Sequence, residues 1–190
     1  MMIEMDRRRM LEGVGALIGF VALPMGALAA PAAGKPPLLD PAAAALLTAI
    51  ADTLIPRTDT PGAVDAKVPA TFDALMRDWA TPAHRTAYLA ALTAIDDEAK
   101  AKAGKPFALL TPVQRKAVLA PYDAAHLATD MRYAALKDML INLYYLSEPG
   151  ATVELRYEHV PGVWEASTPI TVETRAWAGA MPPDKLLTIA

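Results

Sequence analysis

The chain has 190 residues, a formal net charge of -3 and a hydrophobic share of 54%, which fits one domain plus a targeting segment and not two full domains. Its basic residues are scattered after the first dozen positions, a distribution that excludes a nucleic-acid-binding protein. The absence of cysteine excludes disulfides, thiolate metal sites, iron–sulfur clusters, thioether-bound haem and a cysteine nucleophile.

Residues 1–29 are predicted to form an export signal. Arg7 and Arg8 stand just before an apolar stretch over residues 13–30, the arrangement of a twin-arginine signal peptide, and a small-x-small sequence predicts cleavage after Ala29. An ordinary secretory signal and an uncleaved anchor are the alternatives. The twin-arginine pathway carries folded proteins, so its use by a small chain suggests that this chain folds in the cytoplasm around a cofactor-loaded partner and carries the signal for both. The expected location is the periplasm.

Residues 30–40, rich in proline, are predicted to be a linker, and helical signals begin directly after them. A capping side chain followed by proline marks a helix start, because the side chain accepts from free amides and proline lacks the unused N–H. This signal occurs at Asp40-Pro41, Thr81-Pro82 and Thr111-Pro112, and more weakly at Val68-Pro69, which lacks a capping side chain.

Apolar spacing predicts the faces of these helices. Leu46, Leu47, Ile50 and Leu54 form one stripe of a helix that ends at Pro56. A long amphipathic helix is predicted from Pro82 to Gly104, with Tyr88, Leu92, Ile95 and Ala99 on its apolar face. A second, from about Asp130 to Leu146, is predicted to form the centre of the bundle through Leu136, Met139, Leu140 and Leu143.

The pattern changes after Ser147. Val153, Leu155 and Tyr157 alternate with polar residues, which predicts a short strand, and Ile170 with Val172 suggests a second. The predicted fold is therefore mainly all-α: a small helical bundle over residues 41–165 with a short strand or hairpin, followed by an extended C-terminal arm over residues 166–190.

No catalytic constellation is visible in the sequence. His84, His126 and His159 are far apart and lack a metal-ligand neighbourhood, so each is interpreted as a surface or helix-end histidine. The carboxylates of residues 96–98 point in different directions on a helix and are interpreted as a solvated face. No glycine-rich phosphate loop is present.

Two strings resemble a known family: ADTLIPRTDTPGA at residues 51–63 and YYLSEPGA at residues 144–151, followed by Val160-Pro161-Gly162. They are similar to the gluconate 2-dehydrogenase subunit 3 family, over roughly residues 40–165. The first string is a composite turn, in which proline stops a helix and Pro61-Gly62 sets a tight reversal. Its structural turn residues are Pro56, Arg57, Asp59, Pro61 and Gly62. Leu143 and Leu146 depart from the family pattern, in which glycine and threonine are expected.

The resemblance implies a non-catalytic small subunit of a membrane-associated, FAD-dependent sugar or sugar-acid dehydrogenase. It implies no cofactor in this chain, FAD in a glucose-methanol-choline-type flavoprotein partner, and haem c in a possible multihaem cytochrome c subunit. The small subunit would aid maturation, stability and twin-arginine export of the flavoprotein. Gluconate, glucose and glycosides remain open as substrates of the complex.

Aromatic residues concentrate in the last quarter of the chain, where they either anchor an interface or close the core. We predict that the second half of the domain binds the partner through Tyr144, Tyr145, Ser147, Glu148, Leu155, Tyr157, Val160, Pro161 and Trp164. Two other functions compete with this one. The first is a free-standing periplasmic binding or scaffold protein, and the second is a hydrolase or isomerase whose acidic and histidine residues meet only in the fold.

Overall fold

A computed structural model describes residues 35–157, 167, 169–172 and 174–176 of the chain. The chain divides into two compact units, residues 1–36 and 37–190, and the fold described here is that of the second. Within the described residues the regular structure is helical, which confirms the prediction of a mainly all-α bundle. No helix in this described part is both long and apolar enough to cross a membrane.

Helix α2 spans Pro41–Leu54 and α3 spans Val68–Asp78. The carboxylate of Asp40 accepts from the N–H of Ala43 at 2.8 Å, and α2 ends before Pro56, both as predicted. Helix α3 starts without a side-chain cap, also as predicted, after Lys67 in the left-handed region at φ 58°.

Helix α4 spans Pro82–Ala103 and α5 spans Pro112–His126, and both begin at the predicted threonine-proline signals. Thr111 and Gln114 form a reciprocal capping box at the start of α5. Gly104 ends α4 in the left-handed conformation at φ 67°. The short helix η1, Phe107–Leu109, lies between them, and the Asp96 carboxylate accepts from the N–H of Phe107 at 2.8 Å. Asp96 is therefore partly buried, and the solvated-face interpretation is wrong for this residue.

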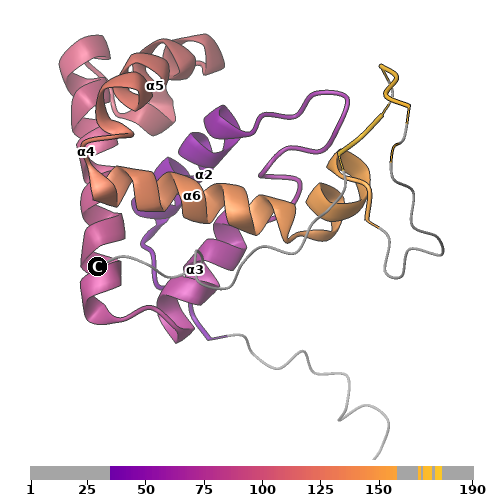
Figure 1. Cartoon of the computed structure of the whole chain (residues 1–190). Coiled ribbons are helices and arrows are strands. Elements are labelled where there is room, and N and C mark those ends of the chain that lie inside the picture. The colour runs from indigo at the N-terminus through magenta and orange to yellow at the C-terminus, as the bar shows by residue number, and fades with distance from the viewer. Residues whose placement is uncertain (1–34, 158–166, 168, 173, 177–190) are drawn as a thin grey trace, which may run out of the picture. The chain divides into compact units, whose positions relative to one another are not determined.

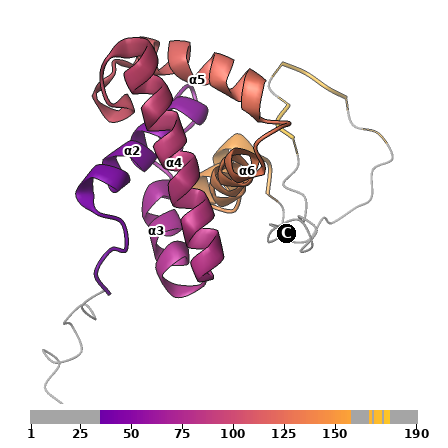
Figure 2. The ribbon, with the colours of Figure 1, turned by 90° about the vertical axis from the view of Figure 1, so that its left-hand side faces the viewer.

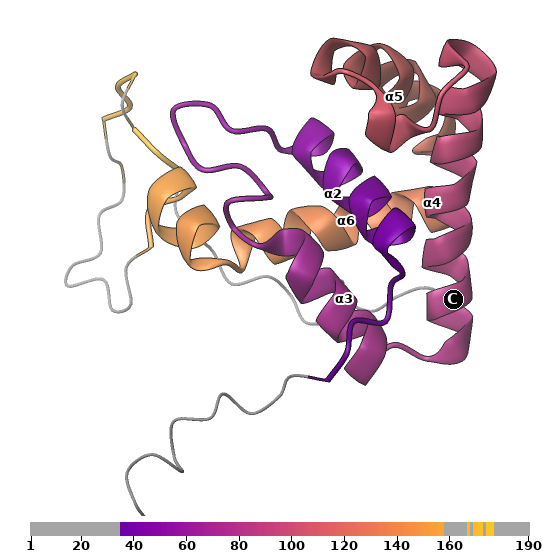
Figure 3. The ribbon, with the colours of Figure 1, turned by 180° about the vertical axis from the view of Figure 1, so that it is seen from behind.

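Helix α6, Met131–Tyr145, packs against α3 and α4. It runs from the α4 side of the bundle to the opposite end, where the turn η2, Gly150–Glu154, folds against it (Figures 1 and 3). Figure 2 views α6 nearly along its axis, with α3 and α4 beside it. Among the principal contacts, α6 thus meets two α-helices whereas α4 meets α2, α5 and α6, so the prediction that α6 forms the centre of the bundle is not confirmed.

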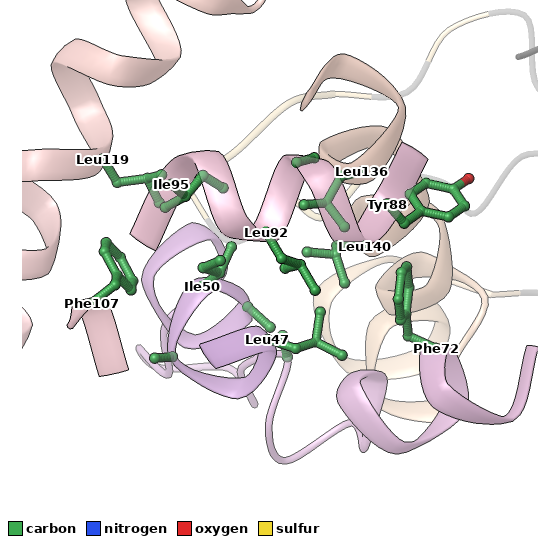
Figure 4. Packing of buried hydrophobic residues seen from close by; sticks show 14 of the residues in the cluster. Leu47, Ile50, Phe72, Tyr88, Leu92, Ile95, Phe107, Leu119, Leu136 and Leu140 are labelled. Carbon is green, nitrogen blue, oxygen red and sulfur yellow. The ribbon is translucent and has the colours of Figure 1, made fainter. Parts of the chain in front are cut away.

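The hydrophobic core gathers residues from helices α2 to α6 and from η1. Leu47, Leu92 and Leu140 point toward one another at its centre (Figure 4). Phe72 and Tyr88 meet edge to face with ring centroids 5.4 Å apart, and Phe107 fills the side near α5. The stripes predicted on α2, α4 and α6 all face this core: eight of their residues are buried in it, and the other four, Leu46, Leu54, Met139 and Leu143, are partly buried against it.

The two short strands predicted after Ser147 are absent from the described residues. Gly150–Glu154 forms one turn of π-helix instead, in which the N–H of Leu155 donates to the carbonyl of Gly150 at 3.0 Å. An alternation of apolar and polar residues over so few positions does not distinguish a strand from a helical turn. Ile170 and Val172 are exposed and outside any strand, next to a turn in which the N–H of Thr174 donates to the carbonyl of Thr171.

Candidate functional site

The two strings that carry the family resemblance meet in space. The phenol of Tyr144, at the end of α6, donates to the carbonyl of Pro61 at 2.7 Å across 83 residues of sequence. The loop between α2 and α3 and the turn after α6 lie together at the end of the bundle away from α5 (Figures 1 and 3). We name residues 55–65 the motif loop and residues 144–154 the exit turn.

The motif loop is braced by its own side chains. The guanidinium of Arg57 binds the carboxylate of Asp65 through two hydrogen bonds of 2.8 and 2.5 Å. The same carboxylate accepts from the N–H of Gly62 at 2.9 Å, and the N–H of Ala63 donates to the carbonyl of Ile55 at 2.9 Å. A bidentate arginine–carboxylate pair fixes orientation as well as distance, so the exposed loop is held in one shape.

Glycine is required at position 62 by close backbone packing. A Cβ atom there would lie 2.6 Å from the nitrogen of Arg57 and 2.8 Å from the carbonyl oxygen of Ile55. The Pro61-Gly62 reversal predicted from the sequence thus depends on the missing side chain.

The exit turn is equally tight. The hydroxyl of Ser147 donates to the carbonyl of Tyr144 at 2.5 Å and accepts from the N–H of Gly150 at 3.2 Å. A Cβ on Gly150 would lie 2.0 Å from the carbonyl oxygen of Tyr144. The chain therefore reverses directly against the end of α6, and this close approach accounts for Gly150 in the second string.

Polar side chains tie the motif loop to the exit turn and to the C-terminal arm. The hydroxyl of Thr60, a buried polar residue, donates to the Glu154 carboxylate at 2.5 Å. The guanidinium of Arg175 binds Asp59 at 2.8 Å and lies 3.8 Å from Glu154. The N–H of Arg156 donates to the carbonyl of Ala176 at 2.7 Å. The motif loop, the exit turn and the C-terminal arm are thus joined by hydrogen bonds and an ion pair into one surface.

The electrostatics of this surface follow from these pairs. The hydrogen bond from Arg57, with a second from the Gly62 N–H, lowers the pKa of Asp65. Hydrogen bonds from Arg175 and then Thr58 lower the pKa of Asp59. Burial, followed by the nearby Glu154 carboxylate, raises the pKa of Tyr144, whose phenol stays neutral and acts as a donor. The carboxylates of Asp59 and Asp65 are therefore charged and compensated within the chain.

The structure narrows the predicted partner-binding set. Tyr144 is only 2% exposed, so its side chain belongs to this chain's own core and cannot lie on a partner surface. Tyr145, Glu148 and Tyr157 are exposed, whereas Ser147 and Leu155 are half-buried. The remaining predicted residues, Val160, Pro161 and Trp164, lie outside the described residues, as do the signal residues Arg7, Arg8 and Ala29.

Sequence reasoning missed Asp65, Thr60, Glu154 and Arg175 as parts of this site. Asp65 lies eight residues after Arg57 in an irregular loop, where no periodicity indicates a pair. Arg175 lies 116 residues from Asp59, a separation that carries no local signal. Only the resemblance singled out both strings, and it did not indicate that they touch.

Among the described residues outside this site, His126 and Asp123 make structural contacts, while His159 lies outside the described residues. The ring of His126 stacks on Tyr122 with centroids 4.1 Å apart, at the C-terminus of α5. Asp123 accepts from the Tyr133 phenol at 2.8 Å and from the Lys137 ammonium at 2.7 and 2.8 Å, which joins α5 to α6. Among the described residues no group of three or more histidine or acidic side chains is placed to hold a metal ion.

Comparison with known proteins adds one finding. The sequence model of the family described as gluconate 2-dehydrogenase subunit 3 matches residues 41–162, a span that holds the bundle, the motif loop and the exit turn. Neither a curated protein nor a solved structure gives a match. Because the match covers well over half of the chain, the chain belongs to the gluconate 2-dehydrogenase subunit 3 family.

Proposed function

We propose that this chain is the non-catalytic small subunit of a membrane-associated, FAD-dependent sugar or sugar-acid dehydrogenase complex. In this role it aids the maturation, stability and twin-arginine export of a glucose-methanol-choline-type flavoprotein, which carries the FAD and the substrate site. The family's name supports the coarser statement that the chain is one subunit of a multi-subunit dehydrogenase. A multihaem cytochrome c is the proposed third subunit.

The observation that carries the proposal is the braced surface formed by the motif loop and the exit turn. Packing of the core does not require ion pairs between exposed side chains. In the motif loop, however, exposed Arg57 is paired with Asp65 and exposed Asp59 is paired with Arg175. Ordering a loop before association lowers the entropy that binding must overcome. A rigid, exposed loop on a small helical scaffold is therefore well suited to hold a partner protein.

The amino-acid sequence supports the proposal that the partner, and not this chain, carries the redox cofactor. The chain has no cysteine and no glycine-rich phosphate loop, the features that hold iron–sulfur clusters, covalent haem, flavin or nicotinamide in many oxidoreductases. The proposed role of this chain is thus to bind and accompany the flavoprotein. The oxidised sugar is then selected by the partner.

The proposed export signal of this chain would also serve its flavoprotein partner. Arg7 and Arg8 precede the apolar stretch as in twin-arginine signals, with cleavage proposed after Ala29. A folded, FAD-loaded flavoprotein bound in the cytoplasm would cross with the chain and reach the periplasm. Membrane association would come from the assembled complex.

The test is co-expression of this chain with a glucose-methanol-choline-type flavoprotein from the same organism. Wild-type chain should deliver active flavoprotein to the periplasm. The double substitution Arg7→Lys and Arg8→Lys keeps the charge but removes the arginine pair, so both proteins should stay in the cytoplasm. Export of this chain with no effect on any flavoprotein would favour a free-standing scaffold, and unchanged delivery by the double variant would exclude the twin-arginine route.

A further inference from the structure

The C-terminal arm returns to the surface that the two strings build. The guanidinium of Arg175 binds the carboxylate of Asp59 in the motif loop at 2.8 Å. One residue further along the arm, the carbonyl of Ala176 accepts from the N–H of Arg156 at 2.7 Å. Terminal segments are usually poorly ordered unless contacts tie them down, and here a side chain and a backbone group both do so. We name residues 174–176 the clasp.

The clasp meets the motif loop and the exit turn at the place where those two segments touch. The Arg175 guanidinium lies 3.8 Å from a carboxylate oxygen of Glu154, and the same oxygen accepts from the Thr60 hydroxyl at 2.5 Å. The neighbouring Asp59 accepts from Arg175 and from the hydroxyl of Thr58. One arginine of the arm therefore lies between carboxylates of both segments, so its position is coupled to theirs.

The internal brace of the motif loop leaves the middle of the loop to other contacts. The pair formed by Arg57 and Asp65 joins the two ends of the loop. Residues 58–60 lie between these ends, and two of their side chains bond to Arg175 of the arm and Glu154 of the exit turn. The order of this middle segment therefore depends on parts of the chain outside the loop.

The clasp is held weakly enough to open. The side chains of Arg175 and Asp59 are 42% and 74% exposed, and exposed ion pairs contribute little to stability because water and salt screen them. The backbone hydrogen bond from Arg156 adds to this pair. Contacts of this strength allow a segment to open and close while the rest of the fold stays intact.

We propose that the clasp is a reversible conformational device, which orders residues 58–60 while Arg175 is bound and releases them when it leaves. Closure also sets the charge of this surface, because Arg175 compensates Asp59 and Glu154 only while the clasp is closed. The device involves this chain alone and does not depend on the proposed function. The competing explanation is that the motif loop keeps its shape through its own contacts, whatever the arm does.

Two backbone amides report on the clasp and on the loop separately. The N–H of Arg156 donates to Ala176 of the clasp, and the N–H of Thr58 donates to the carbonyl of Thr60 at 3.1 Å. Hydrogen exchange of both amides is measured by NMR on the full chain, at about 0.05 M NaCl. Because the Thr58 amide is bonded within the loop, its exchange rate should respond to the arm only if the loop opens with the clasp.

Arg175→Gln removes the charge but keeps a polar side chain, so it should open the clasp. Exchange of both amides should become at least about threefold faster, by factors that agree within about twofold, as expected when two sites open in one step. Arg132→Gln is the matched control, since Arg132 is 54% exposed and forms a similar pair with Asp130 at the start of α6. The control should change neither rate by more than about 1.5-fold.

Salt provides a second measurement that leaves the wild-type chain unaltered. Raising NaCl from about 0.05 to about 0.5 M shortens the screening length roughly threefold, so exchange of both amides should become faster in the wild type. In Arg175→Gln the same change should alter the rates by less than about 1.5-fold, because the charge that salt would screen is absent.

The decisive outcome is the behaviour of Thr58. If its amide exchanges at the wild-type rate in Arg175→Gln, the arm does not order the loop and the proposal is overturned, whether or not the Arg156 amide becomes faster. The same conclusion follows from equal acceleration in the Arg132→Gln control, or from salt effects of equal size in the wild type and Arg175→Gln. Equal acceleration of the amide of Ile95, which is buried in α4, would assign the change to global unfolding and would also overturn the proposal.

Discussion

At the scale of single residues, the glycines of the two strings are required by backbone contacts. A Cβ atom added at position 150 would lie 2.0 Å from the carbonyl oxygen of Tyr144, and one added at position 62 would lie 2.6 Å from the backbone nitrogen of Arg57. Gly104 differs, because nothing lies within 4 Å of its Cβ position and only its positive φ favours glycine. Glycine is therefore required at positions 62 and 150 because a side chain would clash, and favoured at position 104 because the backbone is left-handed.

We predict that Gly150→Ala lowers the free energy of unfolding by about 3 kcal/mol, because the backbone of the exit turn must move away from α6. Gly104→Ala should cost about 1 kcal/mol, the penalty of a left-handed backbone alone. Urea denaturation of both variants measures the difference. Equal losses would contradict the tight contact between Gly150 and Tyr144.

The Tyr144 phenol donates a hydrogen bond that joins the two strings directly, and its ring is buried. Tyr144→Phe keeps the ring and leaves the Pro61 carbonyl without this donor, so it should cost about 1 to 2 kcal/mol. Tyr145→Phe, at an exposed neighbour, is the control and should change stability by less than about 0.5 kcal/mol. A Tyr144→Phe variant as stable as the wild type would show that the strings are held together by packing alone.

At the scale of elements, helix starts were predictable and the exit turn was not. The signals at Asp40, Thr81 and Thr111 are local, since a side chain three residues before a free amide caps it whatever the rest of the chain does. The π-helical turn depends instead on contact between Gly150 and the end of α6, which is tertiary. Alternation in residues 153–157 therefore misled the strand prediction.

The link between α5 and α6 should respond to acid. Burial of Asp123 opposes its charged form, but hydrogen bonds from Lys137 and Tyr133 outweigh it, and the pKa of this carboxyl falls below its ordinary value. A lowered folded-state pKa stabilises the fold above the unfolded-state pKa of about 3.9, and the stabilisation is lost as pH falls through the folded-state pKa. Asp123 should therefore hold α5 on α6 fully at neutral pH and progressively less below about pH 4.

Asp123→Asn tests this link. The variant should have a lower Tm at pH 6, by the equivalent of about 1 to 2 kcal/mol, because the charged hydrogen bonds of Lys137 and Tyr133 are weakened. Its Tm should then fall less steeply than that of the wild type between pH 4.5 and pH 3, a range that brackets an ordinary carboxyl pKa of about 4. Parallel Tm curves for the two proteins would show that Asp123 does not titrate with folding.

At the scale of the whole molecule, the sequence predicted the bundle and singled out both strings, but not the site they build. The contacts of Thr60 with Glu154 and of Asp59 with Arg175 span 94 and 116 residues, and no periodicity reports such pairs. Tyr144 illustrates the ambiguity of aromatic residues, since its ring lies in the core while Tyr145 beside it is exposed. The family resemblance pointed to the residues of both strings, and only the fold shows that the two strings lie in contact.

We propose that this chain accompanies a flavoprotein and performs no redox chemistry alone. Its lack of cysteine and of a phosphate loop predicts that the isolated chain binds no flavin, haem or metal and reduces no dye when sugar is added.

The most direct measurement is purification of the tagged chain from the periplasm of its native host, followed by an absorption spectrum and protein identification. A glucose-methanol-choline-type flavoprotein should co-purify in stoichiometric amount, with a flavin spectrum that bleaches when its sugar is added. After the two chains are separated, this chain alone should show no flavin spectrum. A chain that purifies without a flavoprotein, or one that by itself holds a stoichiometric cofactor and oxidises a sugar, would contradict it.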